Sequence, residues 1–271
     1  MRLSTRLAAA AAAVLALSLP IAAEAHRAWL LPSATVLSGA DVWVTVDAAV
    51  SNDLFFFEHQ PLRLDGLRVT APDGSPARPE NQATGRYRST FDVRLEQPGT
   101  YKLAVVNAGL FASWKENGQT RRWRGSPERF AAEVPKDAPD LRVTQSQSRM
   151  EVFVTSGKPS GTVLKPTGEG LELAPVTHPN DLAVGNAARF RFLLDGRPAA
   201  GLKVTVIRGG IRYRDKLEEM TLTTGEDGGF AVTWKEPGMY WVEASVRDGN
   251  AAIKEAKERR AGYSTTLEVL P

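Results

Sequence analysis

The sequence predicts an all-β protein made of two tandem immunoglobulin-like antiparallel β-sandwiches. Short segments alternate apolar and polar residues with a period of two, as strands do when one face is buried. Turn residues separate these segments at a spacing of roughly 8 to 12 residues. The phrase at residues 96–101 returns at residues 235–240 with its flanking apolar residues in register, which indicates two related units.

The first 25 residues predict a signal peptide. Arg2 and Arg6 precede an apolar run, and Ala23 and Ala25 supply the small residues of a cleavage site. The run is shorter than the roughly 20 uninterrupted apolar residues of a membrane span. We therefore expect cleavage after Ala25, export to the periplasm or beyond, and no stable membrane insertion of the mature chain.

Composition excludes two kinds of site. The chain has no cysteine, so neither disulfides nor thiolate metal ligands are available. The formal net charge of +3 comes from many residues of both signs, and this mild excess does not by itself indicate a nucleic-acid partner.

The first predicted domain covers residues 26–156. Alternation over residues 35–48, interrupted by a turn at residues 38–41, predicts two short strands. Alternation returns over residues 64–70 and 86–95, on either side of a stretch rich in Pro, Asp and Gly. Further strands are expected at residues 102–107 and 141–155.

The segment 112–140 is charged and rich in glycine and proline. It contains Lys115, Arg121, Arg122, Trp123 and Arg124, a basic and aromatic composition that also occurs on nucleic-acid surfaces. In an exported protein we expect a long polar hairpin or an interdomain loop instead.

The second predicted domain covers residues 171–271, after a linker at residues 157–170 that is rich in Gly, Pro, Ser and Thr. A short strand is expected at residues 171–175 and a final strand at residues 264–270. Alanine, lysine and glutamate at residues 250–260 predict an exposed turn of helix.

Imidazole chemistry is limited to His26, His59 and His178. Cleavage after Ala25 would make His26 the first residue, whose α-amine and ring Nδ1 can chelate one metal ion together. The apolar residues 29–32 are expected to pack and to hold His26 in place. The alternative is a frayed terminus with no ligand.

His59 follows the aromatic cluster 54–57, where a β framework could hold a second ligand. Glu58 and Asp53 are weaker oxygen donors beside it. The alternative for His59 is a half-buried histidine satisfied by hydrogen bonds. His178 precedes a proline, so a turn or packing role is its natural interpretation; as a ligand, it would put the metal at the domain interface.

An amine with two imidazoles is a nitrogen-rich donor set that suits Cu(II) or Ni(II), while zinc or cobalt with a carboxylate stays open. The sequence has no G-x-S-x-G elbow, no H-E-x-x-H pair, no glycine-rich phosphate loop and no cysteine nucleophile. We therefore expect a protein that is not an enzyme, with a copper-dependent oxidase as a remaining alternative.

Four separated phrases resemble an exported bacterial family of unknown function (DUF4198 type). They lie at residues 25–32, 57–62, 171–181 and 227–240. The family is often described as a periplasmic component of cobalt or nickel uptake systems. The resemblance implies a soluble periplasmic protein that binds a divalent transition metal (nickel, cobalt or copper), with a membrane or outer-membrane transporter as partner.

Members of related nickel-uptake components present a metal at a processed N-terminus, where the histidine usually follows the first residue. Here His26 would itself be first, which resembles the histidine brace of copper-binding periplasmic proteins. The second half also resembles carboxypeptidase-regulatory-like β modules at residues 195–201 and 227–230. Those modules are mostly structural or interaction domains, which implies an alternative function: a cell-envelope module that binds protein or glycan without a metal.

Overall fold

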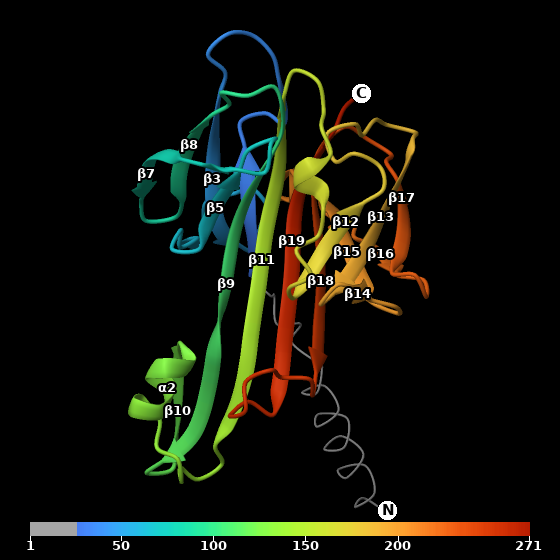
Figure 1. Cartoon of the computed structure of the whole chain (residues 1–271). Helices are drawn as coiled ribbons and strands as arrows, with labels where there is room; N and C mark the ends of the chain where they lie inside the picture. Colours follow the sequence, from blue (N-terminus) through green and yellow to red (C-terminus); the bar gives the residue numbers. More distant parts are fainter. Residues whose placement is uncertain (1–25) are drawn as a thin grey trace, which may run out of the picture.

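The computed structural model describes residues 26–271, and the predicted signal peptide lies outside them. The described chain is all-β, as predicted, with three sheets, one α-helix and two 3-10 helices (Figure 1). None of the helices formed by residues 26–271 is both long and apolar enough to cross a membrane.

The strands fall into a five-stranded sheet A, a ten-stranded sheet B and a four-stranded sheet C. Sheet A contains β1 (Arg27–Pro32), β3 (Trp43–Ser51), β4 (Gln60–Pro61), β7 (Pro79–Thr84) and β8 (Ser89–Arg94). Sheet B contains β2 (Val36–Leu37), β5 (Leu67–Thr70), β6 (Pro76–Ala77), β9 (Gly99–Glu116), β10 (Gln119–Gly125), β11 (Arg142–Ser156), β15 (Lys203–Arg208), β16 (Met220–Thr223), β18 (Gly238–Asp248) and β19 (Glu258–Val269). Sheet C contains β12 (Leu171–Pro175), β13 (Ala187–Leu194), β14 (Arg197–Pro198) and β17 (Gly229–Thr233). The helices are α2 (Pro127–Glu133), η1 (Thr162–Leu164) and η2 (Ile211–Tyr213).

Sheet B runs without interruption through both halves of the chain. Its long strands β9, β11 and β19 lie side by side along the molecule (Figure 1). The two halves meet where β11 pairs in parallel with β19, with Met150 opposite Ser264. Segment 157–170, which was predicted as a linker, therefore connects two units that also share a sheet.

Sheets A and C cover opposite faces of sheet B. Met150 and Val152 of β11 pack into the core beneath sheet A. Tyr263 and Leu267 of β19 pack into a separate core beneath sheet C. Since Met150 is level with Ser264 in the parallel register, and successive side chains point to opposite faces, these two cores lie on different sides of the sheet.

The repeated phrase folds in the same way in both halves. The hydroxyl of Tyr101 accepts the N–H of Gln97 at 2.7 Å, and the hydroxyl of Tyr240 donates to the carbonyl of Glu236 at 2.8 Å. Each tyrosine thus bonds to backbone four residues upstream, as a tyrosine corner does. Gly99 and Gly238 precede them with φ of 130° and 133°, a region that disfavours side chains.

A buried cluster of charged residues lies at the join between the halves. Arg149 Nη1 lies 3.1 Å from Glu151 Oε1, and its Nη2 lies 3.6 Å from Glu172 Oε1. Tyr263 donates to Glu151 Oε2 at 2.8 Å. Burial, together with the neighbouring Glu151 carboxylate, raises the pKa of Tyr263 well above its usual range. The cluster therefore joins β11 to β19 through a hydrogen bond to a carboxylate, and β11 to β12 through an ion pair.

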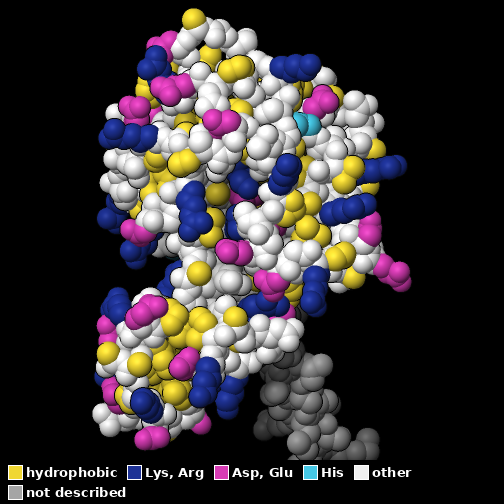
Figure 2. Space-filling model, in the orientation of Figure 1, with side chains coloured by type: hydrophobic (Ala, Val, Ile, Leu, Met, Phe, Trp, Pro, Cys, Tyr) yellow, Lys and Arg dark blue, Asp and Glu magenta, His cyan; other side chains and the backbone are white. Residues whose placement is uncertain are grey.

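Segment 112–140 contains a hairpin, one of the two predicted alternatives, followed by a short helix. Strands β9 and β10 form a hairpin, and α2 packs on it through Phe130, whose ring meets Trp123 edge-on at 5.6 Å. Leu110 and Ala112 of β9 are buried in the same cluster. Figure 2 shows hydrophobic side chains gathered on this lobe, so apolar packing supplements the hairpin hydrogen bonds.

The helix predicted at residues 250–260 is wrong. Residues 249–257 form turns and bends, and β19 begins at Glu258. The Gln145 side-chain oxygen accepts the backbone N–H groups of Ala252 and Ile253, and Arg259 pairs with Asp248 in the strand ladder. Tertiary contacts with β11 and β18 thus override a helix propensity that rests on Ala, Lys and Glu alone.

Candidate metal site

The candidate site lies at the end of β3. Strand β1 pairs with one side of β3, with Arg27 opposite Ser51, and β4 pairs with the other side, with Gln60 opposite Val50. His26 directly precedes β1 and His59 directly precedes β4. Two histidines that are 33 positions apart in the sequence, 59 minus 26, therefore flank the same strand end.

The imidazole rings of His26 and His59 stack on each other. Their centroids are 3.8 Å apart and their planes differ by 5°. Both residues are exposed. Nitrogen lone pairs lie in the ring plane, so parallel rings do not yet point at one common position; a shared metal ion requires the exposed rings to rotate.

Glu58 is adjacent to the pair but is used to hold the loop. Its Oε1 accepts the backbone N–H groups of Asn52 and Asp53 at 2.8 and 2.9 Å. Arg27 adds a bond to the Asn52 carbonyl. The loop between β3 and β4 is therefore fixed by a carboxylate that the sequence suggested as a weaker metal donor.

Strand β1 is anchored beneath His26 by a buried tryptophan. Trp29 is 1% exposed, and its Nε1 donates to Ser51 Oγ at 2.8 Å. Its ring packs in an apolar cluster with Leu54 of the aromatic loop and with Ile207 and Trp241 of the second half. The packing that was expected from residues 29–32 thus involves residues of both halves.

The second half also bonds directly to the backbone of β1. Trp241 Nε1 and Ser264 Oγ both donate to the carbonyl of Ala28, at 3.0 and 3.1 Å. This carbonyl lies two residues beyond His26. The position of the first ligand candidate therefore depends on side chains of β18 and β19.

His178 lies elsewhere, in a polar network at the end of sheet B where β9 begins and β11 ends. Its Nδ1 accepts the N–H of Asn180 at 3.1 Å, so the proton of the neutral ring is on Nε2, which lies 3.0 Å from Thr100 Oγ1. Burial lowers the pKa of His178, while a hydrogen bond to Ser160 and the charge of Asp181 act in the opposite direction. This geometry gives His178 a structural role in which both ring nitrogens are occupied.

The structure brings together two of the four proposed side chains. Within residues 26–271, no group of three or more His, Asp or Glu side chains is arranged to hold a metal ion.

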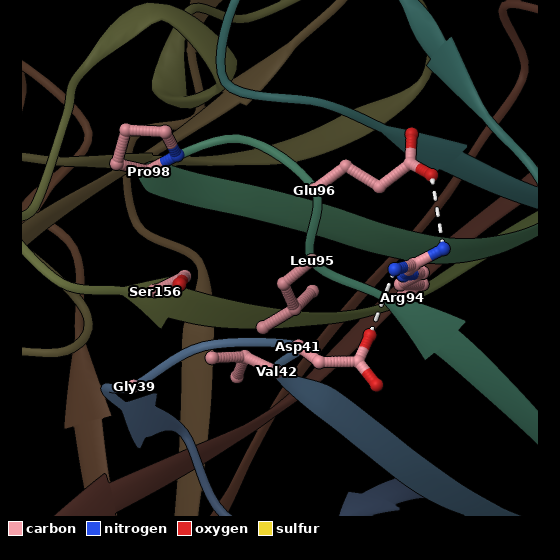
Figure 3. Close-up of a pocket in the computed structure, with 8 residues that line it drawn as sticks. All are labelled: Gly39, Asp41, Val42, Arg94, Leu95, Glu96, Pro98 and Ser156. Carbon is pink, nitrogen blue, oxygen red and sulfur yellow. Dashed lines mark ion pairs between the residues drawn. The ribbon is translucent and has the colours of Figure 1, made fainter.

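A second hollow lies away from the histidines. It has a volume of about 360 Å³ and is lined by Asp41, Arg94, Glu96 and Ser156, among others (Figure 3). Arg94 lies 2.9 Å from Asp41 and 3.9 Å from Glu96, so the two carboxylates already share a cation. This hollow therefore has no free cluster of donors.

Two features of the site were not predicted from the sequence. The hydrogen bonds of Trp241 and Ser264 to the Ala28 carbonyl span 213 and 236 positions, which no local pattern reveals. A wide basic groove beside His26 is the other feature. Its sequence signal is the polar run at residues 144–149, where apolar alternation disappears because neither sandwich core covers the face of β11 that carries Thr144, Ser146 and Ser148.

The family described as a domain of unknown function (DUF4198) matches residues 23–248 of the chain. No curated protein matches the chain significantly. Among solved structures, the D0-D1 domain of intimin is 13% identical, with 89% of this chain and 97% of that chain covered and a TM-score of 0.22. The FN1-FN3 domains of chicken CNTN1 are 8% identical, with 90% and 98% covered and a TM-score of 0.25.

Proposed function

Since the chain belongs to the DUF4198 family, whose description assigns no function, we propose a function from its own residues. The protein is a periplasmic binding protein that holds a divalent transition-metal ion at His26 and His59 and supplies it for uptake by a transporter. It does so without catalysing a reaction. The observation that carries this proposal is the stack of the two imidazoles, 3.8 Å apart.

Cleavage after Ala25 completes the donor set. The new terminus offers its α-amine beside the His26 ring, so one residue contributes two nitrogen donors and His59 contributes a third. Three nitrogen donors favour copper or nickel over hard cations such as magnesium or calcium. Cobalt fits with an additional ligand from solvent.

The surrounding structure holds the backbone next to both rings in place. Trp29 and the bonds to the Ala28 carbonyl fix the strand that follows His26, and the Glu58 carboxylate fixes the loop that precedes His59. Both rings are exposed, so they can turn to face a common ion without disturbing a core. Metal affinity then incurs little cost for ordering the backbone.

The test compares two forms of the protein by calorimetric titration with Cu(II), Ni(II), Co(II) and Zn(II). One form begins at His26, and the other carries one additional alanine before it. We expect the extended form to bind at least about tenfold more weakly, or ~1.4 kcal/mol, because the α-amine no longer chelates with the His26 ring. Equal affinity of the two forms would exclude the terminal amine as a ligand.

The pairing of the two histidines needs its own variants. His59→Ala should weaken binding by a similar factor, whereas Gln60→Ala, an exposed neighbour in β4, should bind as the parent does. If His59→Ala binds as tightly as Gln60→Ala, the second ligand is not His59.

A further inference from the structure

One face of sheet B is left open between the two sandwiches. Sheet A covers this face only in the first half, and sheet C covers the opposite face. The uncovered part forms a groove of about 1480 Å³ across β9, β11, β19, β18 and β15. His26 and Arg27 are among its lining residues, so the groove adjoins the histidine pair.

The groove is basic. Its lining holds eight Lys and Arg residues and three Glu residues. Two of the carboxylates are already paired: Glu258 lies 2.6 Å from Arg247, and Glu219 lies 3.8 Å from Lys203. Arg124, Arg142 and Arg260 are exposed, and in the described chain none of these three forms an ion pair. The unpaired cations therefore favour an anionic partner.

The partner must be recognised through side chains. The backbone N–H and C=O groups of β11, β18 and β19 are used in the ladders that join these strands, so an added strand cannot bind here. Six of the eight cationic residues are arginines, whose planar guanidinium binds a carboxylate through two parallel hydrogen bonds. Arginine is also enriched at protein interfaces.

A polypeptide fits this lining better than an acidic glycan does. Sugars are commonly bound by stacking on accessible aromatic rings. Trp241 is 6% exposed and donates its N–H to β1. Tyr263, another aromatic residue of the lining, is 1% exposed. Phe111 is 40% exposed, so it offers one accessible ring for stacking near one end of the groove.

We propose that the groove docks an extended acidic segment of a partner protein through Arg124, Arg142 and Arg260. This interaction is separate from the metal proposal and does not require a bound ion. Because His26 lines the groove, a docked segment would sit beside the histidine pair.

The test uses the metal-free mature chain and a short fluorescent poly-L-glutamate peptide, with binding followed by anisotropy at low and physiological salt. We expect the parent to bind and the charge-reversed variant Arg142→Glu/Arg260→Glu to lose about tenfold or more in affinity. The variant Arg142→Lys/Arg260→Lys keeps the charge but loses the planar guanidinium groups that make two parallel hydrogen bonds. Its affinity should lie between those of the parent and the charge-reversed variant. Added salt should weaken the parent's binding.

The matched control is Arg86→Glu/Arg197→Glu, which changes the net charge equally at exposed arginines outside the groove. It should keep most of the affinity of the parent. Equal losses in the two charge-reversed variants, or no binding of poly-L-glutamate to the parent, would overturn the proposal. Groove-dependent binding of an oligogalacturonate without binding of poly-L-glutamate would also overturn it and assign the groove to a glycan.

Discussion

The indole N–H of Trp241 donates to the carbonyl of Ala28 at 3.0 Å, which joins β18 of the second half to β1 of the first. Ser264 donates to the same carbonyl at 3.1 Å. This acceptor lies two residues from His26, so the second half positions the strand that carries the first ligand candidate.

Removing both donors should destabilise the protein. In Trp241→Phe/Ser264→Ala the Ala28 carbonyl loses both partners, which should cost about 2 kcal/mol of the free energy of unfolding. Urea unfolding of the variant and the parent measures this change. Trp43→Phe removes an exposed indole bonded at 3.3 Å to Asp41 and should cost less than about 0.5 kcal/mol. Equal effects of the two changes would contradict the anchoring role.

The two repeat glycines should differ in their tolerance of a side chain. Gly238→Ala places a Cβ in open space at a φ of 133°, so the backbone strain alone should cost about 1 to 2 kcal/mol. Gly99→Ala has a similar φ, but its Cβ would also lie 2.6 Å from the Cβ of Pro72. We expect the larger loss of thermal stability for Gly99→Ala, and equal losses would show that the contact with Pro72 relaxes freely.

Replacing the buried arginine at the join of the two halves should destabilise the protein much more than replacing an exposed arginine. Arg149→Met leaves Glu151 and Glu172 without their cation and should cost about 3 to 5 kcal/mol. Arg247→Met breaks a pair with Glu258 that is 2.6 Å long but largely exposed, and should cost less than about 1 kcal/mol. Denaturant midpoints measure both changes. A mild effect of Arg149→Met would mean that water reaches the two carboxylates.

His178 should make stability depend on pH. Burial lowers its pKa in the folded state, so the unfolded chain, with a pKa of about 6.5, binds the proton more readily. The contribution of the neutral ring is therefore complete above about pH 6.5 and is lost as the pH falls from there through the lower folded-state pKa. Urea midpoints between pH 8 and pH 5 should fall less steeply in His178→Gln than in the parent. Identical slopes would show that His178 does not control this range.

Local patterns predicted the strands and the repeat, because a half-buried strand and a tyrosine corner each leave a signal within a few residues. The phrases around Tyr101 and Tyr240 are examples. The helix predicted at residues 250–260 failed because Gln145, which is distant in the sequence, bonds the backbone there. The sequence contains three histidines, and the residues next to His26 and His59 suggested that these two form a pair.

The remaining features of the site depend on how sheets meet. The alternation of apolar and polar residues shows which face of a strand is buried. It does not show which other strand pairs with its edge. Ser146 and Ser148 belong to a polar run because this part of β11 pairs with β19 ahead of Met150, where the core beneath sheet A begins. The groove and its arginines therefore could not be assembled from the sequence alone.

The parallel pairing of β11 with β19 also affects when the protein can finish folding. It places Thr144 beside Glu258, so the central sheet cannot close until almost the entire chain is present. Pairings between such distant segments slow folding, since the loop between them must be ordered before the contact forms. A chain that emerges from its N-terminus therefore anchors β1 late, once Trp241 and Ser264 can bond the Ala28 carbonyl.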